Sequence, residues 1–183
     1  MMVTMLTGAL LATSAAADDS YGAALAEFQK ASETQKFFDT AYGYAVFPTV
    51  GKGGIGIGAA YGKGRVYRGG VYTGNSTLTQ LSIGFQLGGQ AYSEIIFFKD
   101  AKSYNDFTSG SFEFGAQASA VAINVGANAQ AGTTGNSAGA GQHGGNQSAK
   151  AAYINGMAVF TAAKGGLMFE AALAGQSFTY EQR

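Results

Sequence analysis

The chain has 183 residues, of which 11 are Lys or Arg, 11 are Asp or Glu, one is His and none is Cys. This length is typical of a single domain that can bury a core, and the 46% hydrophobic content argues against a disordered chain. The lack of Cys excludes disulfide bonds, a thiol nucleophile and a zinc–thiolate site, and the balanced charge argues against a protein that coats nucleic acid.

The first 17 residues have the pattern of a secretory signal peptide. An apolar run over residues 3–12 leads into small residues, and Ala15 and Ala17 have the spacing found at a cleavage site. The run is too short to span a bilayer, and the usual basic start is missing because no Lys or Arg precedes Lys30. We expect residues 1–17 to be a signal peptide and residues 18–183 to be one domain, exported and either periplasmic or membrane-associated on the outer side. An ordinary apolar N-terminal helix is the alternative.

An amphipathic helix is predicted over about residues 20–38. Its apolar residues follow helical spacing and form one stripe: Tyr21, Ala24, Leu25, Phe28 and Ala31. Such a stripe indicates packing on a core, and a helix that lies on a membrane surface is the alternative, although its polar face is balanced rather than basic.

The hydrophobic period then changes to two, which is typical of strands. The clearest alternation lies over residues 81–87, and Ile95–Phe98 reads as a strand buried on both faces. Further strands are expected at 44–47, ending at Pro48, at 65–72 after a turn at 62–64, at 112–120, 152–161, 167–174 and 177–180, with a short helix near 100–107. The fold class is therefore α+β and mainly β: a glycine-rich antiparallel sheet, or a closed barrel, with an N-terminal amphipathic helix and one short internal helix.

Glycine supplies 29 residues and falls into two groups. Gly54, Gly56 and Gly58 alternate along a predicted strand and would leave one sheet face free for a ring or a helix. Residues 126–148 are Gly, Ala, Asn, Gln, Ser and Thr with little to bury, and we expect a flexible loop there.

No residue set carries catalysis or metal binding. Gly51, Gly53 and Gly56 match the GxGxxG dinucleotide fingerprint, but the chain continues as a strand and offers no acid for a ribose before Glu94. His143, the one imidazole, lies in the glycine-rich loop without partners that would make it a base or a ligand. We therefore expect a protein without enzymatic activity, cofactor or metal.

The charge distribution indicates a binding surface. Residues 40–93 contain no acid but include Lys52, Lys63, Arg65 and Arg68. Each basic group near an anionic bilayer contributes about 1 kcal/mol, so four would give weak, salt-sensitive binding. The alternative is a set of solvated charges at strand ends.

Several segments, taken in order, match one family pattern. Residues 41–48 resemble an A-x-G-x-x-V-F-P opening, residues 52–64 a glycine ladder, and residues 84–98, with Glu94, a central G-x-Q-x-G segment. Residues 164–170 are similar to the bacterial form of a closing motif, with an extra glycine and Glu170 relative to eukaryotic members. Together they resemble the SYLF domain, a lipid-binding family that includes fungal actin-bundling proteins, over about residues 20–180.

The resemblance implies a non-enzymatic domain that binds membrane lipids, phosphoinositides in eukaryotic relatives. Combined with the acid-free segment, it leads to the hypothesis of an exported domain that binds anionic lipid through Lys52, Lys63, Arg65 and Arg68, with Lys164 as a weaker addition. An exported protein would not meet actin, so actin is not an expected partner. The alternatives are a small outer-membrane β-barrel and a structural or assembly protein that binds another protein.

Overall fold

The computed structural model describes residues 19–51, 60–80, 91–114, 123–124, 152–163 and 175–183. Two helical segments open this part of the chain, over residues 19–30 and α2, and α3 lies between two strands. The labelled elements are α2 (Ser32–Thr40), β1 (Gly43–Gly51), β2 (Ala60–Arg68), β3 (Val71–Gln80), β4 (Tyr92–Phe98), α3 (Ala101–Phe107), β5 (Phe112–Glu113), β6 (Ile123–Asn124), β7 (Met157–Ala163) and β8 (Gln176–Gln182).

All the described strands form one sheet in the order β5-β8-β3-β2-β1-β4-β7-β6. Every neighbouring pair is antiparallel except β6 and β7, which are parallel. Among the described residues the sheet has two ends, at β5 and at β6, so it is open there. The fold class predicted from the sequence, α+β and mainly β, is confirmed.

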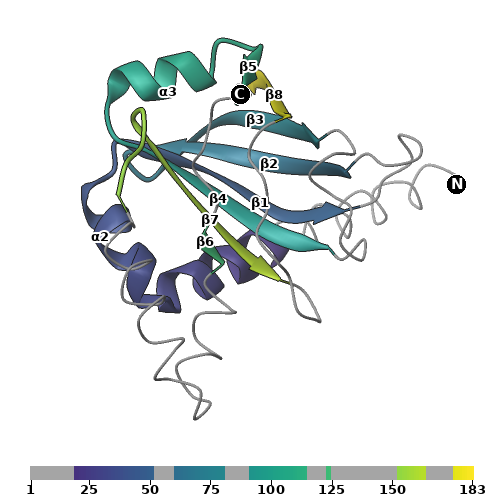
Figure 1. Cartoon of the computed structure of the whole chain (residues 1–183). Coiled ribbons are helices and arrows are strands. Elements are labelled where there is room, and N and C mark those ends of the chain that lie inside the picture. Colours follow the sequence, from purple (N-terminus) through teal and green to yellow (C-terminus); the bar gives the residue numbers. More distant parts are fainter. Residues whose placement is uncertain (1–18, 52–59, 81–90, 115–122, 125–151, 164–174) are drawn as a thin grey trace, which may run out of the picture.

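The sheet is strongly curled (Figure 1). Gln176 Nε2 on β8 donates to Glu94 Oε1 on β4 at 3.0 Å, although β3, β2 and β1 lie between these strands. A flat sheet would place β8 and β4 about 19 Å apart. Before Arg68, the intervening β2 presents Ala60, Gly62, Gly64 and Val66 to the inside of the curl, and these small residues leave room for side chains from both sides.

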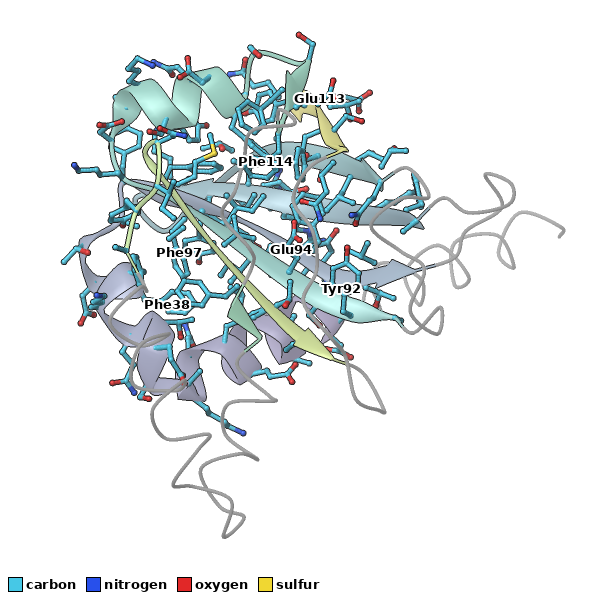
Figure 2. The ribbon with its side chains drawn as sticks, in the orientation of Figure 1. Phe38, Tyr92, Glu94, Phe97, Glu113 and Phe114 are labelled. Atoms are coloured by element: carbon cyan, nitrogen blue, oxygen red, sulfur yellow. The ribbon has the colours of Figure 1, made fainter. Side chains whose placement is uncertain are left out.

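Each face of the sheet has its own core. The inner face of the curl packs against α3 and is centred on Phe47, Ile96, Phe98, Phe107 and Phe178. The outer face packs against residues 19–40, and its buried aromatic side chains are Phe28, Phe37, Phe97 and Phe160. Phe38 meets Phe97 edge-on at 4.9 Å between ring centroids. Figure 2 labels both residues between the sheet and the N-terminal helices.

The predicted amphipathic helix is confirmed, with one interruption. Ala24 and Phe28 are buried against the outer face of the sheet, and Tyr21, Leu25 and Ala31 are partly buried there. The helix breaks at Ala31, whose backbone is extended, and α2 follows. The Thr34 hydroxyl donates to the carbonyl oxygens of Phe28 and Ala31, which stabilises the break. The stripe therefore packs on a core, the first of the two roles that its spacing allowed.

Three boundaries differ from the prediction. The strand that was expected to end at Pro48 continues to Gly51, because the register shifts there and no ladder hydrogen bond needs a Pro48 N–H. The turn expected at residues 62–64 lies instead at Gly69–Gly70, whose φ values of 58° and 80° suit a tight hairpin. The strand expected over 152–161 begins at Met157, after a turn at Asn155 and Gly156 with positive φ.

Other predicted elements are confirmed or fall on residues outside the described ranges. Ile95–Phe98 belongs to β4, which is buried throughout, and α3 begins where the short helix was expected, with Asp100 accepting a hydrogen bond from the Ser103 N–H. The signal peptide, the glycine ladder, the strands at 81–87 and 167–174 and the loop at 126–148 lie outside the described residues. None of the helices in the described ranges is long and apolar enough to span a membrane.

Candidate anion-binding site

The structure places the predicted basic residues of β2 on different faces of the sheet. Ala60 and Val66 belong to the inner core, so the alternating Lys63 and Arg65 point to the outer face. Arg68 falls on the inner side, where its guanidinium lies 5.5 Å from the ring centroid of Tyr104. Lys52 and Lys164 lie outside the described residues. Strand alternation alone therefore divides the cluster that the sequence suggested.

The three arginines of the chain nevertheless gather around tyrosines at one end of the sheet. Arg65 lies 4.1 Å from the ring centroid of Tyr21 and 5.0 Å from that of Tyr72. Arg183 lies 4.7 Å from the Tyr72 centroid. We call Arg65, Arg68, Arg183, Tyr72 and Tyr104 the arginine–tyrosine cluster. Stacking on a ring orients a guanidinium while its N–H groups remain able to bind phosphate or carboxylate oxygens in pairs.

A shallow groove of about 450 Å³ opens beside this cluster. Because Tyr72 contacts Arg65 and also lines the groove with Arg68, it connects the two faces of the sheet. The lining residues come from β2, β3, α3 and the end of the chain: Arg68, Tyr72, Thr73, Tyr104, Tyr180, Gln182 and Arg183.

Backbone and hydroxyl hydrogen bonds hold the groove in place. The Gly69–Gly70 turn sets Arg68 opposite Val71, and the register of β2 on β3 shifts at Val66/Tyr67. Thr73 collects three contacts: its carbonyl accepts from the Arg183 N–H at 2.9 Å and the Tyr180 hydroxyl at 3.2 Å, and its Oγ1 accepts from the Tyr104 hydroxyl at 2.8 Å. The tyrosine rings are thus fixed by partners inside the protein.

The groove is positively charged. Among the described residues no Asp or Glu side chain lines it, and neither Arg68 nor Arg183 forms an ion pair with one. Glu181 alternates with Tyr180 and Gln182 along β8, so its side chain points to the other face. Burial is the main influence on Tyr180 and raises its pKa, whereas the Arg68 guanidinium lowers it. The arrangement can bind an anion through two guanidinium groups, and no described Asp or Glu side chain in the lining competes for them.

A second polar group lies inside the curl, at the other end of the sheet. Gln176 Nε2 donates to Glu94 Oε1 at 3.0 Å and to Gln80 Oε1 at 3.3 Å, and the Tyr92 hydroxyl donates to Gln80 Oε1 at 3.0 Å. Figure 2 shows Tyr92 and Glu94 side by side on β4. Burial raises the pKa of Glu94 to about 8, against a smaller opposing effect of Gln176, and burial likewise raises the pKa of Tyr92. Glu94 is therefore a neutral, enclosed carboxyl group, and its position suits a structural role.

The charge pattern of the sequence indicates Arg65 and Arg68 but gives no sign of Arg183 or the tyrosines. Arg183 reaches the groove only because β8 pairs with β3 across a long sequence separation. One signal was present in the composition: only three of the 11 basic residues are arginines, and two of them lie three residues apart in the predicted strand 65–72.

The sequence also led us to expect no catalytic, nucleotide-binding or metal-binding residues, and the residues weighed for these roles lie mostly outside the described ranges. His143 and most of the GxGxxG match lie outside the described residues. Within the part of the chain that the structure describes, no group of three or more His, Cys, Asp or Glu side chains could hold a metal ion.

Comparison with protein families gives a match. A family model described as Ysc84, Las17-binding protein actin regulator, matches residues 79–183, more than half of the chain. This region includes Tyr104, Tyr180 and Arg183 of the groove, whereas Arg68 and Tyr72 precede it. No curated protein sequence matches the chain. The match confirms the family resemblance seen in the sequence motifs.

Proposed function

Since the chain belongs to the Ysc84 (SYLF) family, described as Las17-binding actin regulators, we propose that it acts as a binding protein for membranes that carry anionic lipid. The arginine–tyrosine cluster supplies the contact surface. The observation that supports this most is the gathering of all three arginines beside a groove whose described lining includes no Asp or Glu side chain.

The chemistry of the cluster suits lipid phosphates. A guanidinium group offers a planar fork of N–H donors that matches two phosphate oxygens, and stacking on tyrosine reduces the entropy lost on binding. The groove is shallow and open, so a headgroup that projects from a bilayer can enter it without the whole lipid leaving the membrane. Lys63 and Arg65 on the outer face, and Lys52 and Lys164, are proposed to add long-range attraction to the anionic surface.

The expected strength is modest. Arg68 and Arg183 would together contribute about 2 kcal/mol near an anionic surface, a factor of about 30 in affinity. Binding of this kind weakens at high salt because charges farther apart than about 10 Å are screened at 0.1 M ionic strength.

We also propose that the protein works after export, on the outer side of the membrane, because residues 1–17 have the signal-peptide pattern. The family description names actin regulation, which an exported protein would not perform. Co-sedimentation with actin filaments separates the two: pelleting with actin would contradict an exclusively lipid-directed role.

Vesicle co-sedimentation tests the lipid-binding proposal. The protein is expected to pellet with phosphatidylcholine vesicles that contain 30% phosphatidylglycerol, to stay in solution with pure phosphatidylcholine, and to be released by 0.5 M salt. The double variant Arg68→Ala/Arg183→Ala should bind about 30-fold more weakly.

A charge-matched control is Lys30→Ala/Lys36→Ala, which removes two exposed positive charges from residues 19–40. This control should bind as the unmodified protein does. Equal loss in both double variants would show that only net charge matters, and failure of the unmodified protein to pellet would refute lipid binding.

A further inference from the structure

The exposed large hydrophobic side chains of the described chain are three in number: Tyr42, Val71 and Ile154. Their exposed fractions are 36%, 64% and 48%. Isolated exposed apolar residues are ordinary on a protein surface, so their positions relative to one another decide whether they matter.

All three lie at the same end of the sheet. Tyr42 precedes β1, Val71 begins β3 directly after the Gly69–Gly70 turn, and Ile154 lies in the turn before β7. A chain of backbone hydrogen bonds connects these places: Gly69 N–H to Tyr42 O at 3.2 Å, Tyr42 N–H to Phe98 O at 2.9 Å, and Lys99 N–H to Gly156 O at 2.9 Å. In Figure 1 these strand ends converge at the left.

This end of the sheet also carries the positive charge described above. Arg68 is paired with Val71 across the hairpin, and Arg183 is tied to Thr73 two residues beyond Val71. Two described acids that follow β4 have partners of their own: Asp100 accepts from the Ser103 N–H at 2.9 Å, and Asp106 pairs with Lys102 at 2.9 Å. Apolar tips are thus flanked by arginines without acid partners in the described residues.

The apolar stripe of residues 19–30, a second surface that could meet a membrane, is covered in the fold. Ala24 and Phe28, on the stripe of residues 19–30, are 4% and 0% exposed because they pack on the outer face of the sheet. Docking through that stripe would require the helix to leave its core. Docking through the sheet end requires no rearrangement.

We propose that this end of the sheet is the membrane-docking surface, with Val71 inserted among the headgroups, Tyr42 and Ile154 beside it, and Arg68 and Arg183 at the depth of the lipid phosphates. The inference rests on the proposed lipid binding and adds the orientation of the molecule: the strands point their β2–β3 end at the bilayer. An apolar tip between basic side chains fits an anionic interface, where the side chain enters the acyl boundary and the guanidinium groups meet phosphate.

A single introduced tryptophan tests the orientation, because the chain has none. With vesicles that contain 30% phosphatidylglycerol, the fluorescence of Val71→Trp should shift to shorter wavelength and be quenched by brominated acyl chains. Thr179→Trp, at an exposed position on β8, is the matched control and should keep the emission of a solvent-exposed ring. If Val71→Trp pellets with the vesicles but shows neither shift nor quenching, docking occurs elsewhere and the inference is wrong.

Binding measurements on neutral substitutions give a second, independent test. Val71→Ser should weaken vesicle binding about tenfold, the factor that corresponds to burying one valine side chain, while Val71→Leu keeps the affinity. Circular dichroism verifies that both variants fold. Unchanged binding of Val71→Ser would overturn the inference, as would self-association that depends on Val71 without any effect on vesicles. If no form of the protein pellets with anionic vesicles, the proposed function itself fails, which is a different outcome.

Discussion

Tyr72 shows how much of the candidate site depends on a single residue. Its ring is contacted by Arg65 and by Arg183, which come from β2 and from the end of the chain, and its side chain lines the groove. Arg183, held on this ring, lines the groove together with Arg68, so Tyr72 orients one of the two guanidinium groups of the groove. At this scale the site is a pair of pre-oriented guanidinium groups.

Glu94 is a second residue of interest, because its surroundings in the fold determine its protonation state. Its carboxyl group is fully buried, its Oε2 has no hydrogen-bond partner among the described residues, and its pKa rises from the usual 4.5 to about 8. Between these two pH values the folded protein binds more protons than the unfolded chain. The free energy of unfolding should therefore fall as the pH rises from 4.5 to 8, by up to about 1.4 kcal/mol per pH unit from this group.

The substitution Glu94→Gln tests this. The amide has nearly the same shape but no charge to bury, so the part of the pH dependence that belongs to Glu94 should disappear. Urea unfolding at pH 5, 6.5 and 8 measures it: the variant should gain stability relative to the parent as the pH rises. A constant difference across the three pH values would mean that Glu94 keeps an ordinary pKa.

At the scale of elements, the contact between β1 and β2 explains why β2 is rich in glycine. A Cβ atom on Gly64 would lie 2.5 Å from ring carbons of Phe47 and 2.8 Å from the Val46 carbonyl oxygen. A Cβ on Gly62 would lie 2.8 Å from Val50. The strand therefore uses glycine to let the neighbouring aromatic ring lie against its backbone, inside the curl.

Gly64→Ala should accordingly destabilise the protein by about 1–3 kcal/mol, the usual cost of overpacking a core. Gly22→Ala is the matched control, because a Cβ there meets nothing within 4 Å and the residue lies in a helix. The control should stabilise the protein by about 0.5–1 kcal/mol, since alanine favours helix over glycine. Thermal unfolding of both variants measures the difference, and equal effects would argue against the ring contact.

Local sequence patterns predicted helices and strands well where apolar residues recur at the spacing of a helix or fill a short run typical of a buried strand. The stripe of Tyr21, Ala24 and Phe28 predicted a helix packed on a core, and the apolar run at Ile95–Phe98 predicted a buried strand. The turn at Gly69–Gly70 was misplaced because Gly62 and Gly64 have the same composition as a turn, and only the Phe47 ring distinguishes a strand glycine from a turn glycine.

At the scale of the whole molecule, the curl brings together what the sequence keeps apart. Gln176 reaches Glu94 across three intervening strands, and Arg183 joins Arg68 at the opposite end of the sheet. The sequence predicted the fold class and part of the basic surface. It could not predict that Gln176 reaches Glu94 or that Arg183 lies beside Arg68. Both depend on the pairing of β8 with β3 and on the curvature that the small residues of β2 allow.

The most direct test of the arginine–tyrosine cluster as the anion site uses the fact that the chain has three arginines. Their side-chain Nε–Hε groups give three nuclear magnetic resonance signals, which single Arg→Lys variants assign. Titration with monomeric dihexanoyl phosphatidylglycerol should shift the Arg68 and Arg183 signals in a saturable way, and the zwitterionic dihexanoyl phosphatidylcholine should leave them unchanged. Unmoved arginine signals, while backbone signals over residues 19–30 shift and saturate, would contradict the account.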